Sequence, residues 1–153
     1  MTQSGGRLKV GLIGLGSWGT KIARTIREDI PGFLLHRAAT GNVGAQEYVG
    51  EQCTLYKDWK DLLSNNNIDA VILAIPPRFN REVASVALIK RIPIFIEKPM
   101  TTNHADGEAI LNLAIQHQCI TEVDHIDLFK SASSGISRIS DNASRLMLLF
   151  YHH

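Results

Sequence analysis

The sequence has little that would direct the chain to a membrane, to nucleic acid or out of the cell. None of its apolar runs approaches the roughly 20 residues that cross a bilayer. The segment 1–7 is mostly polar, which predicts no secretory signal and makes the cytoplasm the expected location. A net charge of +1 gives no overall field that would attract nucleic acid or an anionic membrane.

Cysteine is also scarce, and neither Cys53 nor Cys119 lies at a spacing typical of metal ligands. We expect both thiols to act as small buried apolar groups in a reducing compartment. His152 and His153 have no partner at metal-binding spacing, so no metal site is predicted. The 153 residues, 44% apolar and 20% charged, are typical of about one globular domain.

The most informative pattern that is present is Gly14-Leu15-Gly16-Ser17-Trp18-Gly19. It follows the apolar run 8–13, which reads as a buried strand, and it opens a segment with helical spacing that extends to Ile30. In a dinucleotide-binding turn the first glycine permits the bend, the second admits a pyrophosphate and the third allows close helix–strand packing. A merely structural turn is the alternative, but the flanking strand and helix favour nucleotide binding.

Strand and helix patterns alternate along the rest of the chain. This alternation predicts an α/β fold: a doubly wound parallel sheet, of about six strands, with right-handed crossovers. Trp18, Ile22, Ile26 and Ile30 are expected to form the apolar face of the first helix. Strands are predicted over 8–13, 33–39, 54–56, 70–75, 92–96 and 119–123, and further helices over 45–50, 58–63, 80–90 and 103–118.

Ligands of such a sheet bind beyond the carboxyl ends of its strands, which ranks residues by position. The segments at those ends are 14–19, 40–42, 76–80, 97–99 and 124–125. Among them, Glu97 and Lys98 place charge directly after an apolar strand, and Pro99 should hold Lys98 extended. An ordinary surface lysine is the alternative, but the setting after a nucleotide turn favours a functional one.

Three motifs in register carry a family resemblance: the glycine turn, the strand end 74–77 and the sequence Glu97-Lys98-Pro99. Over residues 8–129 the chain resembles the N-terminal domain of the glucose-fructose oxidoreductase, inositol dehydrogenase and rhizopine-catabolism (Gfo/Idh/MocA) family. The resemblance implies a Rossmann domain that binds NAD or NADP and takes part in oxidising or reducing sugars, cyclitols or related polyols. It also implies that Lys98 contacts the reacting hydroxyl and the nicotinamide ribose.

A lysine suits that reaction because oxidation of an alcohol removes a hydroxyl proton while negative charge develops on oxygen. Lys98 is therefore the predicted catalytic residue. The residues predicted to hold the coenzyme are Gly14, Gly16, Ser17, Trp18, Gly19, Thr40, Asn42, Ile75, Pro76, Asn80, Glu97, Lys98 and His125.

The chain departs from the family pattern at two positions near the coenzyme. Asn80 replaces a usual histidine, and we expect it to cap the following helix. The segment Thr40-Gly41-Asn42 offers no carboxylate for a ribose diol, which leaves NAD and NADP both open, and Arg37 is expected to be buried in its strand.

The family also has a second α/β domain with an Asp-x-x-x-His pattern, which this sequence lacks. We expect a coenzyme domain over 1–129 and an amphipathic helical tail, or a remnant of the second domain, over 130–153. His125 is expected to line the crevice rather than to replace the missing acid–base group.

Two functions follow from these patterns. The first is the coenzyme-binding half of an oxidoreductase, expected to form homo-oligomers because an isolated half exposes apolar surface. The second is a dinucleotide-binding regulatory module without turnover.

Overall fold

The computed structural model describes residues 6–64 and 67–123. Six parallel strands form one sheet in the order β3-β2-β1-β4-β5-β6. This is the strand order of a doubly wound dinucleotide-binding fold, so the predicted fold class is confirmed. The elements along the chain are β1 (Leu8–Ile13), α1 (Ser17–Glu28), β2 (Phe33–Ala39), α2 (Gln46–Val49), β3 (Thr54–Tyr56), α3 (Trp59–Ser64), β4 (Ala70–Leu73), η1 (Pro77–Phe79), α4 (Asn80–Ile89), β5 (Ile94–Ile96), α5 (His104–His117) and β6 (Thr121–Val123).

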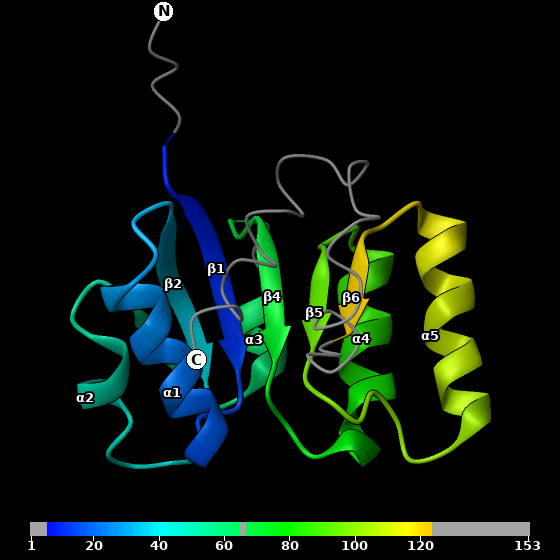
Figure 1. Ribbon diagram of the computed structural model, residues 1–153, viewed down its shortest axis with the longest axis horizontal. Helices are drawn as coiled ribbons and strands as arrows, with labels where there is room; N and C mark the ends of the chain where they lie inside the picture. Colours follow the sequence, from blue (N-terminus) through cyan, green and yellow to red (C-terminus); the bar gives the residue numbers. More distant parts are fainter. Residues whose placement is uncertain (1–5, 65–66, 124–153) are drawn as a thin grey trace, which may run out of the picture.

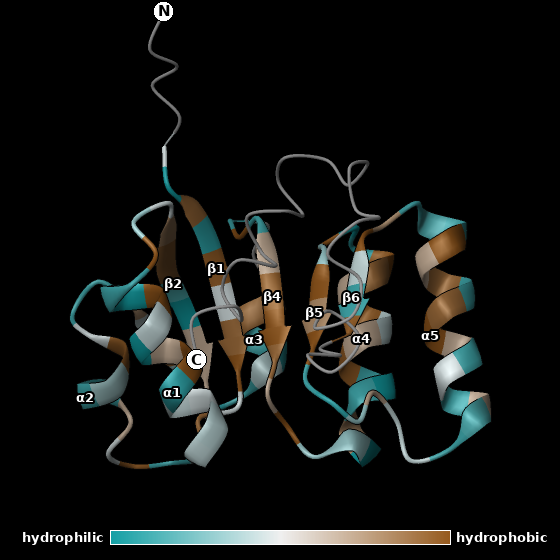
Figure 2. Ribbon diagram, viewed as in Figure 1, coloured by the Kyte–Doolittle hydropathy of each residue, from teal (hydrophilic) through white to brown (hydrophobic). Residues whose placement is uncertain are grey.

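Helices cover both faces of the sheet, and each face has its own apolar core (Figures 1 and 2). On one face, Ile22 and Ile26 of α1 pack over the β1–β2 region together with Val49 of α2. On the other, α3, α4 and α5 contribute side chains such as Leu62, Leu88 and Ile110. Alternate residues of the central strands enter opposite cores, which explains why β4 is apolar at every position.

The strands β2 and β3 have the bounds predicted from sequence, whereas β5 and β6 each begin two residues later than predicted. The cause is the way the preceding helices end. The Ile92 N–H donates to the Ala87 carbonyl, and the Cys119 N–H donates to the Ala114 carbonyl, so both amides serve helix ends instead of the sheet. At the other end, β4 stops at Leu73 rather than at Ile75.

The β1–α1 turn depends on two glycines that lie against backbone. Gly14 has a φ of +100°, and a Cβ there would overlap the Ala74 carbonyl. A Cβ on Gly19 would overlap the Gly14 carbonyl, which brings the first turn of α1 onto the end of β1. Gly16 differs from both, because no atom lies within 4 Å of the Cβ it would carry. The fold therefore requires the first and third glycines, but not the second.

Within the described residues, none of the helices is long and apolar enough to span a membrane.

Gly14→Ala and Gly19→Ala should each lower the free energy of unfolding by at least about 2 kcal/mol, because backbone must move to admit the methyl group. Gly32→Ala is the matched control, since Gly32 is exposed and has open space around its Cβ position. Denaturant titration measures the three values. Equal stability of all three variants would contradict the close-approach argument.

Cys53 should be inert to thiol reagents in the folded protein. Its side chain is buried, and this burial raises the pKa of the thiol to about 12. At pH 8 only about one thiol in ten thousand would be ionised, and the thiolate is the reactive form. Burial also raises the pKa of Cys119, but that side chain is only half-buried, contrary to the prediction that both cysteines are core residues. Ellman titration of Cys119→Ser should detect the Cys53 thiol only after denaturant is added, and rapid labelling without denaturant would refute its burial.

Candidate functional site

The candidate site lies where the chain changes direction between β1 and β4. These strands are neighbours, but the chain leaves β1 toward β2 and leaves β4 toward β5. The two connections therefore part and leave a crevice beyond the strand ends, which is the usual ligand position in this architecture. Figure 1 shows this end of the sheet at its lower edge, where the segments that follow β1, β4 and β5 emerge side by side.

The first turn of α1 faces this crevice with its backbone N–H groups free of side-chain caps. Gly16 is the N-cap residue and makes no side-chain cap hydrogen bond, and the first turn contains no acidic residue. By contrast, Asn103 at the start of α5 accepts a hydrogen bond from the Asp106 N–H. The exposed Gly16 and Ser17 thus present unsatisfied donors and the positive end of the helix dipole, which together suit a phosphate group.

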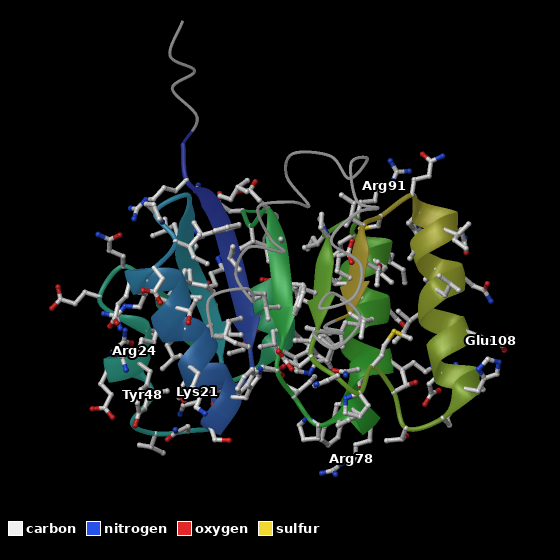
Figure 3. All side chains as sticks on the ribbon, in the orientation of Figure 1. Lys21, Arg24, Tyr48, Arg78, Arg91 and Glu108 are labelled. Carbon is white, nitrogen blue, oxygen red and sulfur yellow. The ribbon has the colours of Figure 1, made fainter. Side chains whose placement is uncertain are left out.

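Two exposed aromatic side chains lie at this edge, each with a cation over its ring. Trp18 is 40% exposed, with the Lys21 Nζ 5.3 Å from its ring centroid. Phe79 is 44% exposed, with the Arg78 guanidinium carbon 4.6 Å from its centroid. Figure 3 shows Lys21 and Arg78 at the lower edge of the molecule. The prediction that Trp18 belongs to the buried face of α1 is therefore wrong: Trp18 lies in the first turn of the helix and is exposed, whereas Ile22 and Ile26 further along the helix are buried.

At the end of β2, a tight turn replaces the carboxylate that is common in NAD sites. The Asn42 N–H donates to the Thr40 Oγ1 at 3.1 Å, and the Gly44 N–H donates to the Asn42 Oδ1 at 3.2 Å. Arg37 is only 7% exposed, as expected from sequence, and donates to the Leu62 carbonyl at 3.2 Å. Its guanidinium is therefore held between the end of α3 and Tyr56, with its central carbon 5.9 Å from the Tyr56 ring centroid.

The segment that carries Glu97 and Lys98 is anchored to the neighbouring connection. The Glu97 N–H donates to the Leu73 carbonyl at 3.0 Å, which holds the end of β5 against the end of β4. Lys98 is exposed and follows at the same edge of the sheet.

Asn80 forms the second anchor. It is fully buried, and its amide Nδ2 donates to the Met100 carbonyl at 2.8 Å. Asn80 is the first residue of α4, and the residue before it, Phe79, has no side-chain cap. The predicted helix cap is therefore wrong: Asn80 ties the start of α4 to the Lys98 segment instead. Its Oδ1 is buried and has no hydrogen-bond partner within the described residues.

An ion pair made by Arg81, the residue after Asn80, supports the hydrogen bond between Asn80 and Met100. The Arg81 Nη1 lies 2.7 Å from the Asp106 Oδ1, joining α4 to α5. Hydrogen bonding from the Asn103 side chain, and then from Arg81, lowers the pKa of the Asp106 carboxyl. The carboxylate therefore stays charged to more acidic pH than an ordinary aspartate, and the connection between β5 and α5 is held at both of its ends.

The structure brings most of the predicted residues to one edge of the sheet. Ser17, Trp18, Thr40, Asn42, Pro76, Glu97 and Lys98 follow the carboxyl ends of four strands. Ile75 is half-buried, with its side chain against the Gly14 position. His125 and the predicted tail lie outside the described residues. Sequence reasoning missed the link from Asn80 to Met100, since 20 residues separate the two and no local pattern signals it.

Comparison with known proteins also indicates a dinucleotide-binding domain. Residues 8–125 match the family described as "Oxidoreductase family, NAD-binding Rossmann fold". Inositol 2-dehydrogenase 4 of Saccharopolyspora erythraea is 31% identical over 102 residues, which are 65% of this chain and 30% of that protein. Inositol 2-dehydrogenase of Corynebacterium glutamicum is 29% identical over 111 residues, 69% of this chain and 32% of the relative.

Solved structures share the fold. The crystal structure of scyllo-inositol dehydrogenase from Lactobacillus casei, with bound NAD(H) and scyllo-inositol, has a TM-score of 0.74 at 24% identity. The match covers 80% of this chain and 37% of that one. The chain thus spans about a third of the length of the proteins it matches. By its sequence match over 8–125 and its sheet order, the chain belongs to the Gfo/Idh/MocA oxidoreductase family and contains that family's NAD-binding Rossmann domain.

Proposed function

We propose that this chain binds a nicotinamide dinucleotide across the β1–β4 crevice and takes part in hydride transfer to or from a polyol. The observation that carries the proposal is the contrast among the three glycines of the turn. Gly14 and Gly19 are fixed by backbone contact, whereas Gly16 lies beside open space at an uncapped helix start. Packing within the protein does not require a glycine at position 16, but a pyrophosphate that approaches the backbone closely would require one.

The polyol substrate is supported by the inositol dehydrogenases to which the chain is similar. The remaining assignments are proposals of the same kind. Residues 1–129 form the coenzyme domain, 130–153 a helical tail or the start of a second domain, and the protein is a cytoplasmic homo-oligomer. His125 lines the crevice in this proposal.

Lys98 is proposed to act on the substrate oxygen. When bound, the coenzyme supplies or accepts the hydride. In the oxidation direction the Lys98 amine would take up the hydroxyl proton, and in the reduction direction the Lys98 ammonium would stabilise the negative charge on the reacting oxygen and return the proton to it. Two hydrogen bonds, from the Glu97 N–H to the Leu73 carbonyl and from the Asn80 Nδ2 to the Met100 carbonyl, fix the segment on either side of Lys98. This anchoring holds the backbone of Lys98 at a constant position relative to the glycine turn, and positioning is a large part of catalysis.

Gly16→Asp should abolish coenzyme binding without loss of stability. Aspartate is a favourable N-cap residue, so the helix is preserved, but its carboxylate repels a pyrophosphate at the same amides. Titration with NADH and NADPH, followed by nicotinamide fluorescence, should show at least about a 100-fold loss of affinity, because repulsion between two negative charges adds to the loss of the amide contacts.

Gly32→Asp is the control, because Gly32 is exposed before β2, at the opposite end of the sheet. It adds the same charge and should leave coenzyme affinity unchanged. Full affinity in Gly16→Asp would exclude the turn as the pyrophosphate site.

Lys98→Met should retain coenzyme affinity within about threefold and reduce polyol-dependent coenzyme reduction by at least about 100-fold, the usual contribution of a positioned acid–base group. Absorbance at 340 nm with myo-inositol and scyllo-inositol measures the rate. Lys90→Met, at the C-terminal end of α4 and thus at the opposite end of that helix from Asn80, is the matched control and should keep full activity. Unchanged turnover in Lys98→Met would remove Lys98 from the mechanism, and coenzyme binding by the unaltered chain without turnover on any polyol would favour the regulatory module.

A further inference from the structure

We infer that the coenzyme of this chain carries a 2′-phosphate, which Thr40, Asn42 and Lys57 hold beyond the carboxyl ends of β2 and β3. The inference rests on the proposed function, because it concerns the adenosine half of the same coenzyme. It goes further by naming NADP(H) as the preferred partner and by naming the residues that select it.

The chain has no carboxylate in the turn after β2. In this architecture an acidic residue near that point accepts hydrogen bonds from the ribose hydroxyls of NAD, and the same acid repels the 2′-phosphate of NADP. Residues 40–46 contain no acid, and Glu47 is the first one after β2, already within α2. Figure 1 shows this connection along the lower left of the molecule, at the same edge as the glycine turn. The turn thus lacks the group that would favour NAD.

The side chains of the turn can offer hydrogen-bond donors to a ligand. The Thr40 Oγ1 already accepts from the Asn42 N–H, and the Asn42 Oδ1 already accepts from the Gly44 N–H. The Thr40 hydroxyl and the Asn42 Nδ2 can each donate a hydrogen bond to a ligand. Each of the two oxygens also keeps a second lone pair, so the turn could accept from a ribose hydroxyl as well. What suits it to a phosphate is that these donors are neutral and that no carboxylate beside them repels a negative charge.

Lys57 supplies a cation beside this turn. Ala39 is paired with Tyr56, and the Thr40 N–H donates to the Tyr56 carbonyl at 3.0 Å, so Lys57 directly follows the strand end that touches Thr40. Lys57 is exposed, and within the described residues it forms no ion pair.

The other charged groups near this point are already engaged. Arg37 is buried and donates to the Leu62 carbonyl, so it is not available to a ligand. The Asp58 Oδ1 accepts from the Lys60 N–H at 2.9 Å, which commits that carboxylate to the start of α3. Lys60 itself lies 3.8 Å from Glu82. Among the residues that the structure describes around the end of β3, Lys57 is therefore the cation proposed to face a phosphate beside Thr40, with the Asp58 carboxylate turned to the start of α3.

Titration of the chain with NADPH and with NADH tests the inference. NADPH should bind at least about tenfold more tightly, since a charge-assisted contact of this kind is worth about one factor of ten or more. Lys57→Gln should reduce NADPH affinity about tenfold and leave NADH affinity within about twofold. Thr40→Asp should reverse the preference, because its carboxylate would repel the phosphate and accept the ribose hydroxyls. Raised salt should weaken NADPH binding more than NADH binding.

Lys60→Gln is the matched control, as it removes an equal charge three residues further on and should leave the ratio of the two affinities unchanged. All three side chains are exposed or half-buried, so circular dichroism should show each variant folded. Equal or tighter binding of NADH would overturn the inference while the proposed function stands. Binding of neither coenzyme would overturn both, and equal weakening of both coenzymes by Lys57→Gln would exclude Lys57 as the selecting residue.

Discussion

The contact between the Gly14 backbone and the Ala74 carbonyl is the constraint on which the site depends. It joins the end of β1 to the residue after β4, and Gly19 then joins the same turn to the first turn of α1. The backbones at the end of β1, after β4 and in the first turn of α1 thus lie so close together that no side chain would fit between them. This close meeting fixes the direction in which α1 begins, and so determines that its free amides face the crevice between the two strands.

From that turn, a short series of hydrogen bonds extends to the lysine. The Ala74 N–H donates to the Ile13 carbonyl, and the Glu97 N–H donates to the Leu73 carbonyl, so β1, β4 and β5 end in step with one another. Asn80 then connects α4 to Met100. The groups proposed for coenzyme binding and for proton exchange therefore lie on segments that these hydrogen bonds connect, although they come from separate parts of the sequence. Such preorganisation is the main contribution that a protein scaffold makes to cofactor chemistry.

The fold could be predicted well from sequence because its signals are local. The apolar strand 70–73, the glycine turn and the alternation of strand and helix each depend on neighbouring residues, and the segments 33–39 and 54–56 were predicted to the residue. The errors concern single residues whose surroundings the local pattern does not reveal. Asn80 is a residue type that often caps helices, but its side-chain amide donates to the Met100 carbonyl instead. Trp18 has the spacing of a core residue, but it lies exposed in the first turn of α1. The residues of the candidate site were predictable as a set of strand ends, whereas their mutual anchoring required the three-dimensional contacts.

The uncapped start of α1 has a further consequence for the stability and degradation of the protein. Its first amides depend on solvent until an anion arrives, whereas α5 carries its own cap in Asn103. An anion bound there completes the helix only in the folded chain, and mass action then shifts the balance away from unfolded molecules. Because proteases degrade the unfolded fraction, such an anion is expected to slow the degradation of the chain.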